Sequence, residues 1–275
     1  FGKAYPDRFF NVGITEANMV SIGAGLSTCG LIPFVCSFSF LITLRAADQV
    51  RSQISYPGLP VKLIGTNGGL SGFSDGATHQ SIMDLAVIRA MPNLTVFVPS
   101  DGITLYQTIL TAAEIEGPVF VRVPRVASPV IHNMEMWLEP GRGILLRSGG
   151  DVTIIAAGLM VVRALDAADT LAAMGIDAEV IEVHTLKPLD EDMVTQSAAK
   201  TGAVVTVEEH NRFGGLTSAI AECLGRYCPV PLEYVAIEDH FAGSGAYEDL
   251  LKDCGLTAEH VVSKTHDVLK RKSKN

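Results

Sequence analysis

The chain has 275 residues, of which 48% are hydrophobic and 19% are charged, and its formal net charge is -9. This length and composition are typical of a globular protein with room for two domains, and they exclude a disordered chain. The negative charge argues against nucleic acid as a partner, because a phosphate backbone requires a basic surface. No window holds the ~18 consecutive apolar residues of a membrane helix, so no membrane association is predicted.

The five cysteines show no Cys-x-x-Cys spacing, which favours a reducing compartment, and we therefore expect a cytoplasmic protein. The sequence begins at Phe1 and not at Met. We therefore expect a chain whose first residues are missing here.

The first half of the chain alternates short β-branched segments with helical patterns. Residues 16–30 form a helical pattern that is small and apolar nearly all round, and such a helix is buried on all sides. We therefore expect this helix to face another subunit as well as its own sheet. The other elements predicted here are strands over 61–66, 94–98 and 119–123 and helices over 48–55 and 102–116.

A second alternating series follows a polar segment marked by proline and glycine. Its strands are predicted over 152–156, 178–183, 203–207 and 232–236, and its helices over 160–174, 190–200 and 214–224. Alternation of strand and helix predicts parallel sheets that are covered on both faces, and hence an α/β fold. We place the domain boundary within 127–143, which gives a first domain over residues 1–135 and a second over residues 136–275.

Two short segments carry the residues best suited to chemistry. Residues 13–16 place the carboxylate of Glu16 at the start of the small apolar helix. Residues 74–80 place Asp75, a turn glycine, a hydroxyl and His79 within five positions, after a loop rich in glycine. Together they would supply a buried acid, with no cation nearby, and a histidine on a loop, a pairing suited to proton transfer.

These segments also carry a family resemblance. The sequences Gly13-Ile14-Thr15-Glu16 and Asp75-Gly76-Ala77-Thr78-His79-Gln80 resemble the transketolases and the related deoxyxylulose-phosphate synthases. Further matching segments, in the same order and spacing, are 8–16, 36–40, 45–51, 99–101, 123–125, 207–210 and 214–215. Because these segments run over nearly the whole chain, it is identified as a member of the transketolase family.

The resemblance implies a thiamine diphosphate-binding pyrimidine domain with a parallel sheet, followed by a transketolase C-terminal α/β domain. It implies transfer of a two-carbon ketol unit from a ketose phosphate to an aldose acceptor. In the family, a separate domain with a Gly-Asp-Gly sequence binds the diphosphate and its divalent metal, such as Mg²⁺, and this chain has no Gly-Asp-Gly. We therefore expect an N-terminal partner subunit that carries the metal ligands, a second copy of this chain, and a heterotetramer.

The resemblance also assigns roles to individual residues. The residue matching Glu16 hydrogen-bonds the aminopyrimidine of the cofactor and is catalytic. His79 is expected to move protons on the sugar hydroxyls, and Asp75 to contact the substrate hydroxyl at C2. Arg125 matches an arginine that binds the terminal phosphate of the sugar, a group for which a guanidinium is well suited. Asn67 stands where many members have a histidine, so the acceptor's end group stays open between phosphate, sulfonate and a branched sugar phosphate.

The aromatic residues that would line the cofactor's pyrimidine ring are left as two alternatives. Either Phe38 and Phe40 line the ring, or Leu41 replaces an aromatic ring with plain apolar packing. His210 is interpreted as a structural residue in a loop at the end of a strand, at a subunit interface. No metal site is expected from it and the two preceding glutamates, because neighbouring residues at a strand end point apart.

Three alternatives to a transketolase subunit remain. A β chain of a 2-oxo-acid dehydrogenase shares the two-domain plan but lacks the Asp75 to Gln80 sequence. A piece of a deoxyxylulose-phosphate synthase is closer, although Asn67 departs from the basic residue of that family. The third is a non-catalytic regulatory module, against which the presence of Glu16, Asp75 and His79 argues.

Overall fold

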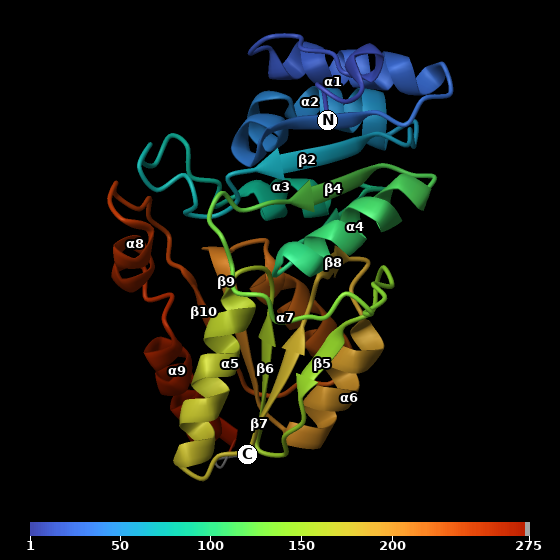
Figure 1. Ribbon diagram of the computed structural model, residues 1–275. Helices are drawn as coiled ribbons and strands as arrows, with labels where there is room; N and C mark the ends of the chain where they lie inside the picture. The colour runs from blue at the N-terminus through green and yellow to red at the C-terminus, as the bar shows by residue number, and fades with distance from the viewer. Residues whose placement is uncertain (273–275) are drawn as a thin grey trace.

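The predicted alternation of strands and helices builds two five-stranded sheets in the computed structural model, which describes residues 1–272 (Figure 1). The first sheet, drawn in blue and green, lies above the second, drawn in yellow and red (Figure 1). Both sheets are mainly parallel, as the sequence predicted.

The first sheet has the strand order β1-β2-β4-β3-β8. Its strands are β1 Phe34–Phe38, β2 Lys62–Thr66, β3 Thr95–Phe97, β4 Val119–Arg122 and β8 Thr185–Lys187. Its helices are η1 Pro6–Arg8, α1 Glu16–Thr28, η2 Leu41–Arg45, α2 Ala47–Gln49, η3 Val50–Ser55, α3 Asp84–Ala90 and α4 Gly102–Glu114. The helix predicted over 48–55 is therefore one turn of α-helix followed by the π-helix η3, and π-helical turns are often found at functional sites.

Strand β8 departs from the predicted division of the chain. It comes from the second half of the sequence, yet it pairs antiparallel with β3 of the first sheet, with Val96 opposite Lys187. The boundary expected within 127–143 lies in the irregular segment between β4 and β5, and the division into 1–135 and 136–275 stays a prediction.

The second sheet has the order β10-β9-β6-β7-β5, and its edge strand β5 runs antiparallel to β7. Its strands are β5 Ile144–Arg147, β6 Val152–Ala156, β7 Ala178–Glu182, β9 Val204–Asn211 and β10 Leu232–Ile237. Its helices are α5 Met160–Ala173, α6 Glu191–Thr201, α7 Leu216–Tyr227, α8 Tyr247–Asp253 and α9 Ala258–Lys272. Helices α5 and α9 pack together on one face, and α6 and α7 pack together on the other.

The two domains share a hydrophobic core. Leu85 and Ile88 of α3 lie in the same buried cluster as Leu216 and Leu224 of α7. This continuity fixes the first sheet relative to the second. Strand β9, which the sequence predicted to end at residue 207, continues to Asn211, and all of its residues are buried. Its last residues therefore lie directly beneath the loops of the first sheet.

Candidate functional site

The predicted site residues gather at the carboxyl ends of β1 and β2, where ligands bind in open α/β sheets. Glu16 begins α1, which packs beside β1. Phe38 ends β1, and the loop over residues 67–80 follows β2 directly. The parallel pairing of β1 with β2 places Phe38 opposite Thr66, so the two chain segments leave the sheet side by side.

Glu16 is buried, with 4% of its surface exposed. Its Oε1 lies 3.4 Å from the hydroxyl of Ser37, and its Oε2 lies 3.3 Å from Nη1 of Arg45. The expectation that no cation lies near Glu16 was therefore wrong. Arg45 sits in the π-helix η2, 29 residues further along the chain, and it reaches Glu16 only because η2 packs against α1.

Three rings pack together and are called the aromatic cluster: Phe38, Phe40 and His79. The ring of His79 lies edge-on to both phenylalanines, with centroid distances of 6.0 Å to Phe38 and 5.6 Å to Phe40. Leu41, by contrast, is buried within η2. Of the two alternatives for the pyrimidine ring, this geometry favours the one with Phe38 and Phe40.

Asp75 and Arg125 form an ion pair, with Nη1 of Arg125 2.9 Å from Oδ2 of Asp75. Both side chains are partly exposed, at 40% and 49%, so an anionic ligand can reach the guanidinium. The backbone N–H of Arg125 also donates to the hydroxyl of Ser71 at 3.1 Å. The two predicted substrate residues are therefore neighbours, although 50 residues separate them in the sequence.

Asn67 stands at the first position after β2 in a left-handed conformation, with φ of 56°. Its side chain is buried, and among the described residues its Nδ2 has no hydrogen-bond partner. A buried donor without a partner carries a free-energy cost.

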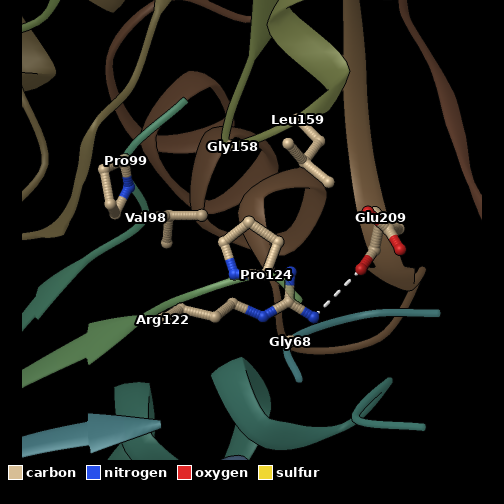
Figure 2. Close-up of a pocket in the computed structure, with 8 residues that line it drawn as sticks. All are labelled: Gly68, Val98, Pro99, Arg122, Pro124, Gly158, Leu159 and Glu209. Carbon is tan, nitrogen blue, oxygen red and sulfur yellow. Dashed lines mark hydrogen bonds between the residues drawn. The ribbon is translucent and has the colours of Figure 1, made fainter. Parts of the chain in front are cut away.

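A buried polar cluster beneath the loop was not predicted from the sequence. Arg122, at the end of β4, forms an ion pair with Asp84 of α3, with Nε 2.8 Å from Oδ2. Its Nη2 donates to the carbonyl oxygens of Ser81 and Glu209 at 2.7 and 3.0 Å, and Figure 2 shows the hydrogen bond to Glu209 at the side of a small cavity that both residues line. The feature of the sequence that pointed to this cluster is the pair of acidic residues before His210, in a segment for which the sequence analysis expects a loop.

His210 differs from its interpretation as a loop residue. It is fully buried within β9, and its Nε2 lies 3.8 Å from Oδ1 of Asp84. Burial lowers the pKa of its imidazole. Within residues 1–272, no group of three or more His, Cys, Asp or Glu side chains is arranged to hold a metal ion. Nor is any described helix long and apolar enough to cross a membrane.

Two family models match the chain. The model of the transketolase pyrimidine binding domain matches residues 1–129, and that of the transketolase C-terminal domain matches residues 141–261. The 6-deoxy-6-sulfo-D-fructose transketolase subunit SqwH of Clostridium sp. (strain MSTE9) is 44% identical over 273 residues, which cover 99% of this chain and 85% of that protein.

Two further similarities bear on the alternatives. The 1-deoxy-D-xylulose-5-phosphate synthase of Heliobacterium modesticaldum is 42% identical over 266 residues, but these cover 95% of this chain and only 40% of that protein. A solved structure described as a split gene transketolase, an inactive beta4 tetramer, superposes with a TM-score of 0.94 at 45% identity, covering 99% of this chain and 88% of that one. The chain therefore belongs to the transketolase family, as a subunit that joins the pyrimidine-binding and C-terminal domains and serves in ketol transfer.

Proposed function

We propose that this chain forms the pyrimidine side of a thiamine diphosphate site, and that an N-terminal partner subunit completes the site by binding the diphosphate and Mg²⁺. The observation that carries this proposal is the buried carboxylate of Glu16 at the start of α1. It contacts Ser37, which directly precedes Phe38 of the aromatic cluster in β1. The similarity to a split gene transketolase and to the transketolase subunit SqwH supports a partner that holds the diphosphate and its metal.

The residues present fit an aminopyrimidine. Glu16 offers a carboxyl group that can share a proton with a ring nitrogen, donating to it when the carboxyl is protonated and accepting from it when the ring nitrogen is protonated, and Arg45 and Ser37 hold it in place. Phe38 and Phe40 offer ring faces against which a flat heterocycle can stack. When bound, the cofactor supplies an electron sink for the two-carbon unit that is transferred.

His79 and Asp75 are assigned to the substrate. Nδ1 of His79 lies 3.0 Å from the hydroxyl of Thr78, so we assign Nε2 to proton exchange with a sugar hydroxyl. Asp75 accepts a hydrogen bond from a hydroxyl of the sugar. The ion pair with Arg125 fixes the orientation of this carboxylate.

The far end of the substrate is an anion held by Arg125, with Asn67 as a second donor. A guanidinium fork binds phosphate and sulfonate with similar geometry. The resemblance of Arg125 to the family's phosphate-binding arginine makes phosphate the first candidate. The named activity of the SqwH relative on a sulfo-sugar makes sulfonate the second candidate. The preference of the site for phosphate or sulfonate determines which class of sugar is the acceptor.

We assign the contacts with partner subunits to the first 56 residues. The exposed large hydrophobic side chains there are Phe1, Tyr5, Phe9, Phe10, Ile14, Leu31, Ile32, Phe34, Leu44 and Tyr56. Large apolar side chains exposed in this number are typical of an interface between proteins. These exposed side chains support a heterotetramer in which each site is shared between chains. The free cysteines agree with a location in the cytoplasm.

The test is ketol transfer by this chain co-expressed with a diphosphate-binding transketolase subunit from the same organism. The assay contains thiamine diphosphate, Mg²⁺, a ketose phosphate donor, and aldose acceptors that end in phosphate or sulfonate. We expect activity only when both chains are present, and a loss of at least about 100-fold for Glu16→Ala. Glu116→Ala, at an exposed position after α4, serves as the matched control and should retain activity.

The outcomes separate the alternatives. A Glu16→Ala complex that keeps full turnover would falsify the catalytic role of Glu16. A wild-type complex that binds no cofactor would instead favour a regulatory module. Condensation of pyruvate with glyceraldehyde 3-phosphate, in place of ketol transfer, would favour a synthase-type subunit.

A further inference from the structure

We propose that Glu209, in the second domain, is a positioning residue for ketol transfer, because with Tyr247 it holds the loop over residues 67–80 in place. This inference rests on the proposed function, since that loop carries Asn67, Asp75 and His79. The C-terminal domain would thereby act on the reaction through the loop, in addition to completing the fold.

Glu209 uses both oxygens of its carboxylate to join the loop to the second domain. Its Oε1 accepts a hydrogen bond from the backbone N–H of Leu70 at 2.6 Å. Its Oε2 accepts one from the hydroxyl of Tyr247, at the start of α8, at 2.8 Å. The residue is buried, with 4% exposure, so neither hydrogen bond is exchanged readily for water.

The loop is shaped to fit this carboxylate. Gly69 has a φ of +66°, a conformation that glycine adopts without strain. A Cβ at this position would lie 2.4 Å from Oε1 of Glu209, so any side chain would collide with the carboxylate. The backbone of the loop therefore packs directly against Glu209.

Other contacts between the loop and the second domain agree with this arrangement. At the end of the loop, Gln80 donates through Nε2 to the carbonyl oxygen of Gly243 at 2.8 Å. In its middle, the N–H of Gly245 donates to the carbonyl oxygen of Phe73, whose ring lies 6.2 Å from that of Tyr247. Residues 243–247 and β9 thus hold the loop from two sides.

The neighbouring glutamate shows what Glu209 does not do. Glu208 accepts hydrogen bonds from the backbone N–H groups of Leu216 and Thr217, and so caps the start of α7 within its own domain. Glu209 has no such role, since its carboxylate faces the loop and Tyr247. Burial raises the pKa of Glu209 to about 7, which shows that keeping an acid there carries a cost.

The test compares Glu209→Ala, Glu209→Gln and Tyr247→Phe in the complete complex, with Glu208→Gln as the matched control. A glutamine can accept from Leu70 through its oxygen and donate to Tyr247 through its nitrogen, so it preserves both contacts. Two readouts are taken: amide hydrogen exchange of residues 67–80, and kcat and KM for the sugar substrates.

We expect Glu209→Ala to accelerate exchange across residues 67–80 by about tenfold or more, corresponding to about 1.4 kcal/mol, and to lower kcat/KM by about 10- to 100-fold. Glu209→Gln should restore both, and Tyr247→Phe should lie between. Glu208→Gln should lower the melting temperature without changing either readout. A Glu209→Ala complex with wild-type exchange in this loop overturns the proposal, as does a Glu208→Gln complex with the same kinetic loss.

The readouts also separate this proposal from the proposed function. If the wild-type complex has no ketol transfer activity, the proposed function fails, while faster exchange in Glu209→Ala still demonstrates the contact between loop and domain. If Glu209→Ala does not fold, Tyr247→Phe decides, because it removes one hydroxyl and keeps the aromatic ring. Unchanged exchange and kinetics in Tyr247→Phe would then count against the proposal.

Discussion

The buried ion pair between Asp84 and Arg122 permits a sharp test of what joins the loop, the first sheet and β9. The side chains are 0% and 7% exposed. Nε and Nη2 of Arg122 lie 2.8 and 3.1 Å from the two carboxylate oxygens of Asp84, and the hydroxyl of Ser39 donates to Oδ2 at 2.5 Å. Burial alone would raise the pKa of Asp84, but the guanidinium of Arg122 and its other neighbours hold it below the usual value.

The perturbation is Asp84→Asn, which keeps the shape and removes the charge. It leaves the guanidinium of Arg122 buried without its counter-ion, and breaking one side of a buried pair costs about 3 to 5 kcal/mol. For a chain of this size, each kcal/mol corresponds to roughly 2–4 °C in melting temperature. We therefore expect a fall of about 10 °C.

The assay is urea-induced and thermal unfolding followed by circular dichroism. Asp48→Asn is the control, because its ion pair with Arg51 is exposed, and it should cost less than about 1 kcal/mol. The double variant Asp84→Asn with Arg122→Met should recover part of the loss, since the guanidinium that lost its carboxylate is then removed as well. If Asp84→Asn cost less than about 1 kcal/mol, the reasoning that this pair is desolvated would be refuted.

Three further predictions concern stability and pH. Burial raises the pKa of Glu209 to about 7 in the folded protein, so its contribution to the free energy of unfolding falls as the pH rises from about 4.5 to 7. Glutamine does not titrate, so the stability of Glu209→Gln should rise by about 3 kcal/mol relative to the wild type over this range, measured by urea unfolding. Burial lowers the pKa of His132, but its contacts with Glu182 at 3.0 Å and Asp101 at 3.2 Å raise it on balance. His132→Asn should therefore lower the melting temperature more at pH 6 than at pH 9, and an equal loss at both would contradict this. Asp101→Ala removes the N-cap of α4, including the bond from Thr104 N–H at 2.8 Å, and should cost at least about 1 to 2 kcal/mol in urea unfolding at pH 7, a smaller loss counting against the cap.

The sequence predicted the buried central strands well, because their continuous apolar segments are unambiguous. Residues 61–66 became β2 and residues 119–123 became β4, each within one residue at either end. Strand β8 was missed because it has three residues and owes its place to pairing with β3, not to its own pattern. Nor did the sequence show that β9 continues past residue 207, because its last residues are Glu, Glu, His and Asn.

At the candidate site, local sequence could name the residues but not their neighbours. The segment from Asp75 to Gln80 is compact, so its chemistry is visible in the sequence. The contacts of Glu16 with Arg45 and of Leu70 with Glu209 join residues 29 and 139 positions apart. No periodicity or spacing encodes such contacts, since they depend on how the two sheets pack.

These long-range contacts bear on why both domains belong to one chain. The loop with His79 leaves the first sheet at Asn67 and leads into α3 after Ser81, and both ends contact groups that depend on β9. An isolated first domain would expose the face of α3 that packs against α7, and would lose the acceptor for Leu70 N–H. Under the proposed function, a division of the enzyme into two chains before the pyrimidine-binding domain would leave these contacts intact. A division between the two domains of this chain would instead separate the substrate loop from the carboxylate that holds it.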